Sequence, residues 1–246
     1  MKRLFSLAFV MILCVTGTSL SQKKFETDSF STSEGDLEIT FIGHGSLMFN
    51  FNGLIIQVDP WSKLADYSKL PKADIILITH QHQDHLDPKA INELKKEYTK
   101  IVCPQTVAES LKEKATVMKN GDFITLEGIE IVAVPAYNLV HKRKNGEFYH
   151  PKGAGNGYIL RFGDKKVYVA GDTENIPEMK NLKNIDIAFL PMNLPYTMTP
   201  QMVVDAVRMI RPKILYPYHY GNTDVNKLLE LLKGEDYCEV RVRDMK

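Results

Sequence analysis

Short apolar runs, separated by turn residues, recur along most of the chain. Such runs, rich in valine, isoleucine and aromatic residues, are typical of β-strands. Asn52-Gly53 between two of them is a strong signal for a β-hairpin. The runs predict strands over residues 37–42, 47–51, 54–58, 74–79, 101–103, 116–119, 123–126, 129–135, 158–162, 166–170, 185–190, 213–216 and 237–242.

Other stretches have the signals of helices. Asp87-Pro88 reads as an N-cap followed by a first-turn proline, and Thr199-Pro200 repeats that signal ahead of apolar residues at helical spacing. Strands come first and then alternate with helices, so the order predicts an α/β fold of two mixed sheets with helices on their outer faces. The predicted helices cover residues 88–98, 106–115, a stretch from Pro200 to about Ile210, and 224–233.

The first 21 residues have a different composition. Lys2 and Arg3 precede an apolar segment over residues 4–13, and Ser19-Leu20-Ser21 provides the small residues of a cleavage site before Gln22. The apolar segment is too short to span a bilayer, which needs about 20 residues. The pattern therefore predicts a cleaved signal peptide over residues 1–21 and an exported protein, periplasmic or secreted, with no transmembrane anchor.

A lipoprotein anchored through Cys14 is the less favoured alternative, because the bulky Leu13 precedes that cysteine. After the signal, residues 22–36 are polar and rich in serine and threonine, and we expect a flexible tail there. A single domain is then expected over residues 37–246, since no linker interrupts it.

Composition narrows the class of protein. Of the 246 residues, 44% are hydrophobic and 25% are charged, as in ordinary globular proteins. Loss of Lys2 and Arg3 would leave 29 of the 31 basic residues against 30 acidic ones, so no basic field for nucleic acid exists. Cys103 and Cys238 lie in predicted strands far apart in sequence, and we expect two buried free thiols.

The densest cluster of side chains that can bind a metal is His80-Gln81-His82-Gln83-Asp84-His85, which contains three of the seven histidines. The string directly follows the predicted strand at 74–79 and precedes the helix at 88–98. Such loops at the carboxyl end of a strand are where α/β proteins place their chemistry. Imidazoles and carboxylates are ligands of zinc, manganese and iron, so the string predicts a metal site.

This string resembles the signature of the metallo-β-lactamase-fold hydrolases, and the resemblance extends from about Leu37 to Gly221. The chain looks most similar to the branch that contains ascorbate-phosphate lactonase-like proteins and the N-acylphosphatidylethanolamine-hydrolysing phospholipase D. The resemblance implies a four-layer αβ/βα sandwich. It also implies two divalent metal ions, with zinc favoured and manganese or iron as alternatives.

Spacing and resemblance together assign the predicted ligands. His80 and His82 are two residues apart in an extended loop, so their side chains can share one ion, while Asp84 and His85 can face a second. The resemblance also assigns Asp172, in Gly171-Asp172-Thr173, as the carboxylate that bridges both ions. It further implies His219 as a ligand of the second ion, and Asp59 as a residue that holds the other ring nitrogen of a ligand histidine.

One ligand departs from the superfamily pattern. Most members have a histidine after the strand that corresponds to residues 129–135, whereas this chain has Asn138, a poor ligand for zinc. His150 is the favoured replacement, because Pro151 restricts its backbone and a similar His-Pro-Lys-Gly element recurs in the sub-branch. Asn138 itself, His141, or an ion with two protein ligands plus water remain alternatives.

Asp84, His44 and Tyr196 are the predicted catalytic residues. His44 lies between two glycines in the Gly-His-x-Ser element of this branch and is expected to touch substrate. Tyr196 follows a predicted strand and could donate a hydrogen bond. Lys152 is a candidate for binding an anion such as phosphate, although solvent exposure is the common fate of a lysine.

The sequence therefore predicts an exported dinuclear hydrolase of a small-molecule substrate. A metal-bridging hydroxide would cleave an ester, lactone or phosphodiester bond. β-Lactamase activity is disfavoured, because exported lactamases of this fold usually have a histidine in place of Asn138. An iron-binding redox module of the same fold and a non-catalytic metal-binding protein are the alternatives.

Overall fold

Two seven-stranded sheets form the centre of the computed structural model, which describes residues 24–111 and 113–246. The first sheet consists of β1 (Glu26–Thr32), β2 (Gly35–Gly43), β3 (Ser46–Phe51), β4 (Leu54–Val58), β5 (Ile75–Leu77), β6 (Lys100–Cys103) and β7 (Thr116–Val117), in that order. The second consists of β8 (Phe123–Leu126), β9 (Ile129–Ala136), β10 (Gly155–Phe162), β11 (Lys165–Val169), β12 (Ile187–Pro191), β13 (Ile214–Tyr218) and β14 (Glu239–Val240).

Both sheets are antiparallel in their first half and parallel in their second. The change occurs at β4 in the first sheet and at β11 in the second. Parallel neighbours need crossover connections, and helices or short 3₁₀ turns occupy most of these. They are η1 (Tyr67–Lys69), α1 (Pro88–Leu94), α2 (Gln105–Leu111), η2 (Pro177–Asn181), α3 (Pro200–Ile210) and α4 (Val225–Leu231).

The strand β5 shows how the first sheet comes to lie between the second sheet and the helices α1 and α2. Its residues are apolar without interruption, as expected for a strand that is buried on both faces. Ile75 and Leu77 contribute to the core between the two sheets, whereas Ile76 and Ile78 pack in the separate core beneath α1 and α2. Alternation along one strand therefore supplies two cores at once.

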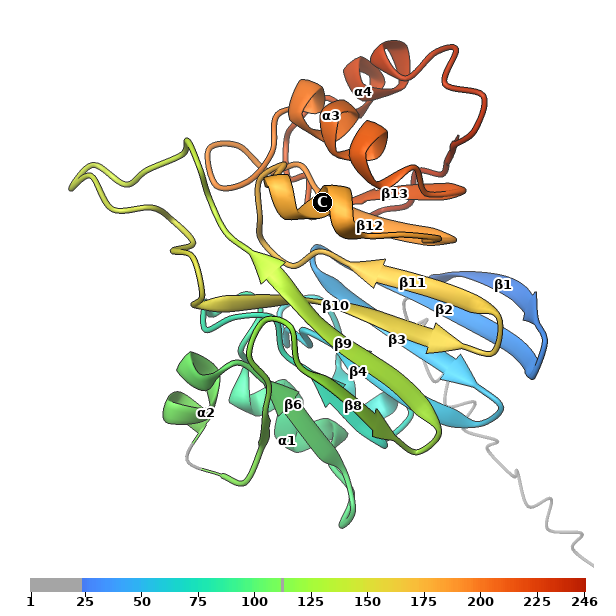
Figure 1. Ribbon diagram of the computed structural model, residues 1–246. Coiled ribbons are helices and arrows are strands. Elements are labelled where there is room, and N and C mark those ends of the chain that lie inside the picture. The colour runs from blue at the N-terminus through green and yellow to red at the C-terminus, as the bar shows by residue number, and fades with distance from the viewer. Residues whose placement is uncertain (1–23, 112) are drawn as a thin grey trace, which may run out of the picture.

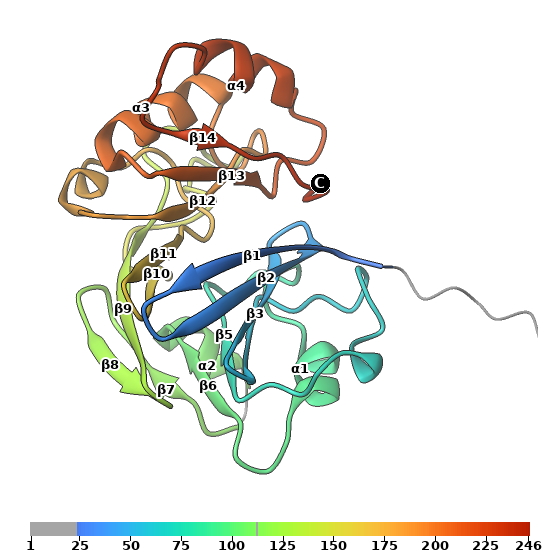
Figure 2. The same ribbon diagram turned by 90° about the vertical axis from the view of Figure 1, so that its right-hand side faces the viewer.

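The four layers are visible in two perpendicular views. Helices α1 and α2 lie outside the first sheet, and α3 and α4 lie outside the second, with the sheets packed between them (Figures 1 and 2). On α3, Val203, Val204 and Val207 are buried against the second sheet. The predicted αβ/βα sandwich is confirmed.

Local predictions mostly agree with the structure. The hairpin at Asn52-Gly53 joins β3 to β4, and both turn residues have positive φ, as the predicted turn requires. Asp87 caps α1 by accepting from the backbone N–H groups of Lys89 and Ala90. The helices at 88–98 and 106–115 are shorter than predicted, and each ends at a leucine, Leu94 and Leu111.

The predicted flexible tail over residues 22–36 is wrong for most of its length. Residues 26–32 form β1, which pairs antiparallel with β2 along its whole length. Asp28 accepts hydrogen bonds from Arg243 at 2.7 Å and also from Tyr216, near the other end of the chain. The polar composition of β1 concealed it, because one face of this edge strand is exposed.

The predicted signal peptide over residues 1–21 lies outside the described residues. Within the described part of the chain, no helix has the length and apolar character needed to cross a membrane. Cys103 is buried and Cys238 is half-buried, and both are free thiols. Burial raises the pKa of Cys103 to about 11, which suits a packing residue and not a nucleophile.

Candidate metal centre

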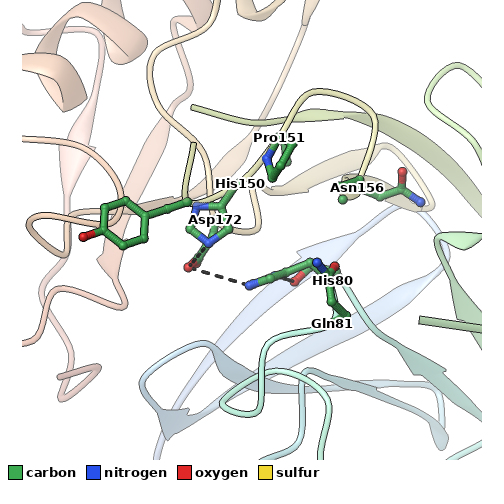
Figure 3. Close-up of a pocket in the computed structure, with 11 residues that line it drawn as sticks. His80, Gln81, His150, Pro151, Asn156 and Asp172 are labelled. Carbon is green, nitrogen blue, oxygen red and sulfur yellow. Dashed lines mark hydrogen bonds and ion pairs between the residues drawn. The ribbon is translucent and has the colours of Figure 1, made fainter. Parts of the chain in front are cut away.

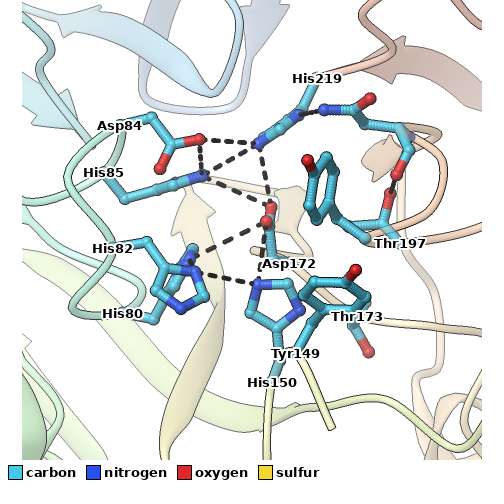
Figure 4. Close-up of polar contacts among 12 residues, drawn as sticks. His80, His82, Asp84, His85, Tyr149, His150, Asp172, Thr173, Thr197 and His219 are labelled. Atoms are coloured by element: carbon cyan, nitrogen blue, oxygen red, sulfur yellow. Dashed lines mark hydrogen bonds and ion pairs between the residues drawn. The ribbon is translucent and has the colours of Figure 1, made fainter. Parts of the chain in front are cut away.

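Seven histidine and aspartate side chains converge where strands of both sheets end. Four follow β5, one lies between β9 and β10, one follows β11 and one follows β13. Figure 4 shows their side chains pointing toward a common centre. The residues are His80, His82, Asp84, His85, His150, Asp172 and His219, and the ring of His44 lies against three of them, Asp84, His85 and His219.

The first group contains three histidines. His82 Nδ1 lies 3.1 Å from His80 Nε2 and 3.2 Å from His150 Nε2. Ligands at 2.0–2.1 Å from one tetrahedral ion are separated by roughly 3.3 Å, so these nitrogens have the spacing of a zinc site. Asp172 Oδ2 joins the group, 3.2 Å from His150 and 3.8 Å from His80 (Figure 3).

The second group has two histidines and a carboxylate. His85 Nε2 and His219 Nε2 are 3.1 Å apart. Asp84 Oδ2 lies 3.8 Å from the former and 3.6 Å from the latter. Asp172 Oδ1 completes the group at 3.5 Å from each imidazole nitrogen.

Asp172 therefore divides its two oxygens between the groups. Its Oδ1 atom is buried and has no hydrogen-bond partner in the described structure, which is costly for a carboxylate oxygen unless a cation is its partner. The preceding Gly171 has φ +66°, and a Cβ there would lie 2.9 Å from a backbone oxygen of Asn156. Only glycine fits this approach, which brings the carboxylate to the centre.

Asp59 holds the ring of His85 from behind, on the side away from the second group. Its Oδ2 atom lies 2.7 Å from His85 Nδ1, and its two oxygens also accept from the backbone and hydroxyl of Thr79. Burial alone would lower the pKa of His85, but Asp172 and Asp59 outweigh it and raise the pKa to about 9. The ring is thus fixed with Nε2 directed at the second group.

His150 is held in a comparable way by Asn138. The Asn138 Oδ1 atom accepts from His150 Nδ1 at 2.8 Å, which leaves Nε2 directed at the first group. The Asn138 amide donates to Glu174 at 2.9 Å. Asn138 is therefore committed to orienting His150, and of the candidates for the missing ligand the structure places His150 beside His80 and His82.

Glu174 organises the loop that follows β9. It is fully buried and accepts from the backbone N–H groups of Leu139, Val140 and His141 at 2.7–2.8 Å. His141 Nδ1 lies 2.7 Å from the same carboxylate, so this ring is turned away from the candidate ligands. Sequence reasoning missed Glu174; its position two residues after Asp172 was the available signal.

His44 lies beside the second group. Its Nε2 atom is 3.1 Å from Asp84 Oδ2, and its ring lies 3.7 Å from that of His219, centroid to centroid. His44, Asp59 and His219 all have φ between 43° and 51°, which is uncommon outside glycine and concentrates at functional sites. This places His44 as a partner of Asp84; the predicted contact with substrate stays a prediction.

A groove of about 320 Å³ opens onto both groups. Tyr196 lies in its wall, with its ring 5.0 Å from that of Tyr149. Lys152 does not line this groove and forms an exposed ion pair with Glu178 at 2.8 Å. The lining residues are His82, Asp84, Arg143, Tyr149, His150, Asp172, Asn193, Tyr196 and His219.

The donors fit divalent first-row ions. All are imidazole nitrogens or carboxylate oxygens, the set that suits zinc, manganese and iron. Burial lowers the pKa of His80 well below its ordinary value and that of His82 to about 4, so both rings keep a free lone pair at neutral pH. The pKa of Asp172 is also well below its ordinary value: burial opposes this, but His219 and His85 outweigh it.

Comparison with known proteins agrees with this geometry. Residues 38–219 match the model of the β-lactamase superfamily domain. A UPF0173 metal-dependent hydrolase of Koribacter versatilis is 31% identical over 221 residues, which cover 83% of this chain and 94% of that protein.

Solved structures show the same relationship. A protein of Parabacteroides distasonis described as a metal-dependent hydrolase is 53% identical, with a TM-score of 0.86 over 91% of this chain and 100% of the other. Igni18, a metallo hydrolase of Ignicoccus hospitalis, is 25% identical, with a TM-score of 0.71 over 85% and 95% of the two chains. The chain therefore belongs to the metallo-β-lactamase superfamily and, within it, to the UPF0173 metal-dependent hydrolases.

Proposed function

We propose that this metal-dependent hydrolase works with two divalent ions, zinc being favoured over manganese and iron. The observation that carries the proposal is the division of the Asp172 carboxylate. Its Oδ2 atom lies 3.2 Å from His150 Nε2, and its Oδ1 atom lies 3.5 Å from His85 Nε2. One carboxylate shared by two nitrogen-rich groups is suited to two cations held close together.

Bound at these groups, two ions would supply a hydroxide near neutral pH and polarise the oxygen on which negative charge develops. Other side chains of the protein would orient the residues that hold these ions. Asp59 and Asn138 hold the outer nitrogens of His85 and His150, which fixes the tautomer that leaves each Nε2 free. His44 Nε2 differs from these two, because it contacts Asp84 at Oδ2, the oxygen that faces the second group.

The reaction that fits best is hydrolysis of an ester, lactone or phosphodiester bond in a small-molecule substrate. Such hydrolysis requires no side-chain nucleophile. Tyr149 and Tyr196 line the groove, where their rings meet edge to face, and the Tyr196 side chain, 43% exposed, can donate to a bound substrate. A lactonase-like activity is the form that the sequence resemblance favours.

The site of action belongs to the same proposal. The basic and apolar amino-terminal segment followed by a small-residue cleavage site supports export, with the mature chain beginning near Gln22. Amino-terminal sequencing of the protein recovered from outside the cytoplasm should read from that residue. Recovery of an intact Met1 inside the cell would refute export, and a lipid on Cys14 would indicate an anchored form.

The dinuclear reaction is tested by metal analysis and a substrate screen together. Protein purified without chelator should contain about two first-row divalent ions per chain. Esters, lactones and phosphodiesters are then screened before and after chelation and after restoration with zinc, manganese or iron. One ion per chain at full activity would refute the dinuclear site, and activity that survives complete metal removal would refute the mechanism.

A further inference from the structure

Arg143 lies in the wall of the groove beside the first group of candidate ligands. Its Nη2 atom is 3.1 Å from His82 Nε2 and 3.4 Å from the backbone oxygen of Tyr149. Its guanidinium lies 5.1 Å from the centroid of the Tyr149 ring. The charged end of this arginine is therefore within reach of a molecule bound at the metal centre.

The loop holds the arginine backbone in a defined turn. The backbone N–H of Arg143 donates to Glu147 at 2.7 Å, and its carbonyl accepts from Gly146 at 3.0 Å. Among the residues that the structure describes, no carboxylate forms an ion pair with Arg143, whereas Lys152 is paired with Glu178. The guanidinium is thus a cation without a protein counter-ion at the edge of the groove.

The orientation of His82 adds a second donor at the same place. Its Nδ1 atom faces His80 and His150, so Nδ1 is the nitrogen available to an ion. A neutral imidazole that binds an ion through Nδ1 carries its proton on Nε2. Nε2–H and the Arg143 guanidinium then face each other as two donors and cannot bond, although a shared acceptor would satisfy both.

We propose that Arg143 and the Nε2–H of His82 form a binding site for an oxyanion on the substrate, a carboxylate or a phosphate, separate from the bond that is cleaved. This inference rests on the proposed metal site and names the substrate class: anionic esters or lactones. A guanidinium presents parallel N–H groups that match two oxygens of such an anion. Tyr149 lies beside it and can contact the connecting part of the substrate.

The experiment compares three nitrophenyl esters whose acyl chains end in a methyl, a carboxylate or a phosphate group. Arg143→Ala and Arg143→Lys are measured beside the parent, and Lys144→Ala is the control for an exposed charge in the same loop. Hydrogen bonds to a charged group contribute enough to predict a 10- to 100-fold loss of kcat/KM, roughly, for the anionic esters in Arg143→Ala. The loss for the methyl ester should be clearly smaller than for the anionic esters, because the methyl ester presents no oxyanion to Arg143.

A binding measurement separates this site from the proposed reaction. Calorimetry compares glutarate with butyrate, which has one carboxylate fewer, on the metal-loaded parent and variants. The parent should bind glutarate more tightly, and Arg143→Ala should erase the difference without changing the metal content. If glutarate binds in this Arg143-dependent way but none of the esters is hydrolysed, ester hydrolysis is refuted and the anion site is still supported.

Three outcomes would overturn the anion site. The parent could show no preference for anionic over neutral molecules, or Arg143→Ala could retain that preference. Lys144→Ala could also reduce it as much as Arg143→Ala does, in which case a diffuse positive field and not a specific site attracts the anion. A preference confined to the carboxylate or to the phosphate ester would identify the natural group.

Discussion

Asn138 Oδ1 accepts two hydrogen bonds from His150, one from ring Nδ1 at 2.8 Å and one from the backbone N–H at 2.7 Å. Asn138, at the position where the resemblance leads us to expect a histidine, therefore orients His150, the residue proposed as the ligand in its place. Its amide group is anchored by Glu174 and by the backbone oxygen of Tyr196. In the proposed metal site Asn138 therefore supports a ligand and does not itself bind the ion.

Asn138→Ala should weaken zinc binding at the first group by about 10- to 100-fold, the usual cost of losing the partner of a ligand histidine. Competition with a chromophoric chelator measures this affinity. Asn145→Ala, in an exposed turn of the same connection, is the control and should match the parent. Equal affinities of Asn138→Ala and the parent would show that His150 needs no such support.

His150→Ala and His141→Ala remove a histidine from the same connection but should differ in effect. His150 Nε2 lies 3.2 Å from His82 Nδ1, whereas His141 contacts Glu174. We expect His150→Ala to lose the ion of the first group, with a deficit greater than the roughly 100-fold typical of an outer partner. His141→Ala should retain both ions in elemental analysis. Loss of an ion in His141→Ala and not in His150→Ala would make His141 the ligand and exclude His150.

Asp172→Ala should lose both ions and abolish hydrolysis while it leaves the fold intact, because both groups share this carboxylate. Elemental analysis and circular dichroism measure the two effects. Asp164→Ala, which removes a carboxylate from the exposed turn before β11, is the control. Full metal content and turnover in Asp172→Ala would eliminate the bridge.

Zinc affinity should rise with pH from about 6.5 to about 9. The pKa of His85 in the metal-free fold is about 9, above its ordinary 6.5, because Asp172 and Asp59 outweigh burial. This proton stabilises the metal-free fold fully below pH 6.5, and its contribution is lost as the pH rises through 9.

An ion must displace that proton, so calorimetry in two buffers should count about one proton released per chain near neutral pH. Asp59→Asn lowers the negative charge beside His85 and should reduce the proton release. Binding that is independent of pH across this interval would show that His85 is neutral before the ion arrives.

Asp28→Ala should destabilise the protein by roughly 1–3 kcal/mol, the usual cost of removing hydrogen bonds to a charged group. Asp28 accepts from both Arg243 and Tyr216 and thereby joins β1 to the end of the chain. Denaturant unfolding of the metal-loaded protein measures the change. Asp36→Ala removes an exposed carboxylate at the start of β2 and should have little effect.

Local signals determined much of the architecture. Alternation and turn residues predicted most strands, because a strand such as β5 must be apolar wherever both its faces are buried. The string from His80 to His85 predicted metal chemistry by its density alone. Asp172 and His219 have weaker local signals, and their roles were predicted through the resemblance.

Contacts between distant residues decided the rest. The orientations of Asn138 and of the backbone at His141 depend on a buried carboxylate, Glu174, that lies 33 to 36 residues from the groups it holds. The strand β1 is polar, and its Asp28 is paired with Arg243, 215 residues away. The Arg143 side chain is directed at the site because its turn folds back to His82. Composition and spacing describe each segment alone, whereas hydrogen bonds and burial depend on which segments the fold brings together.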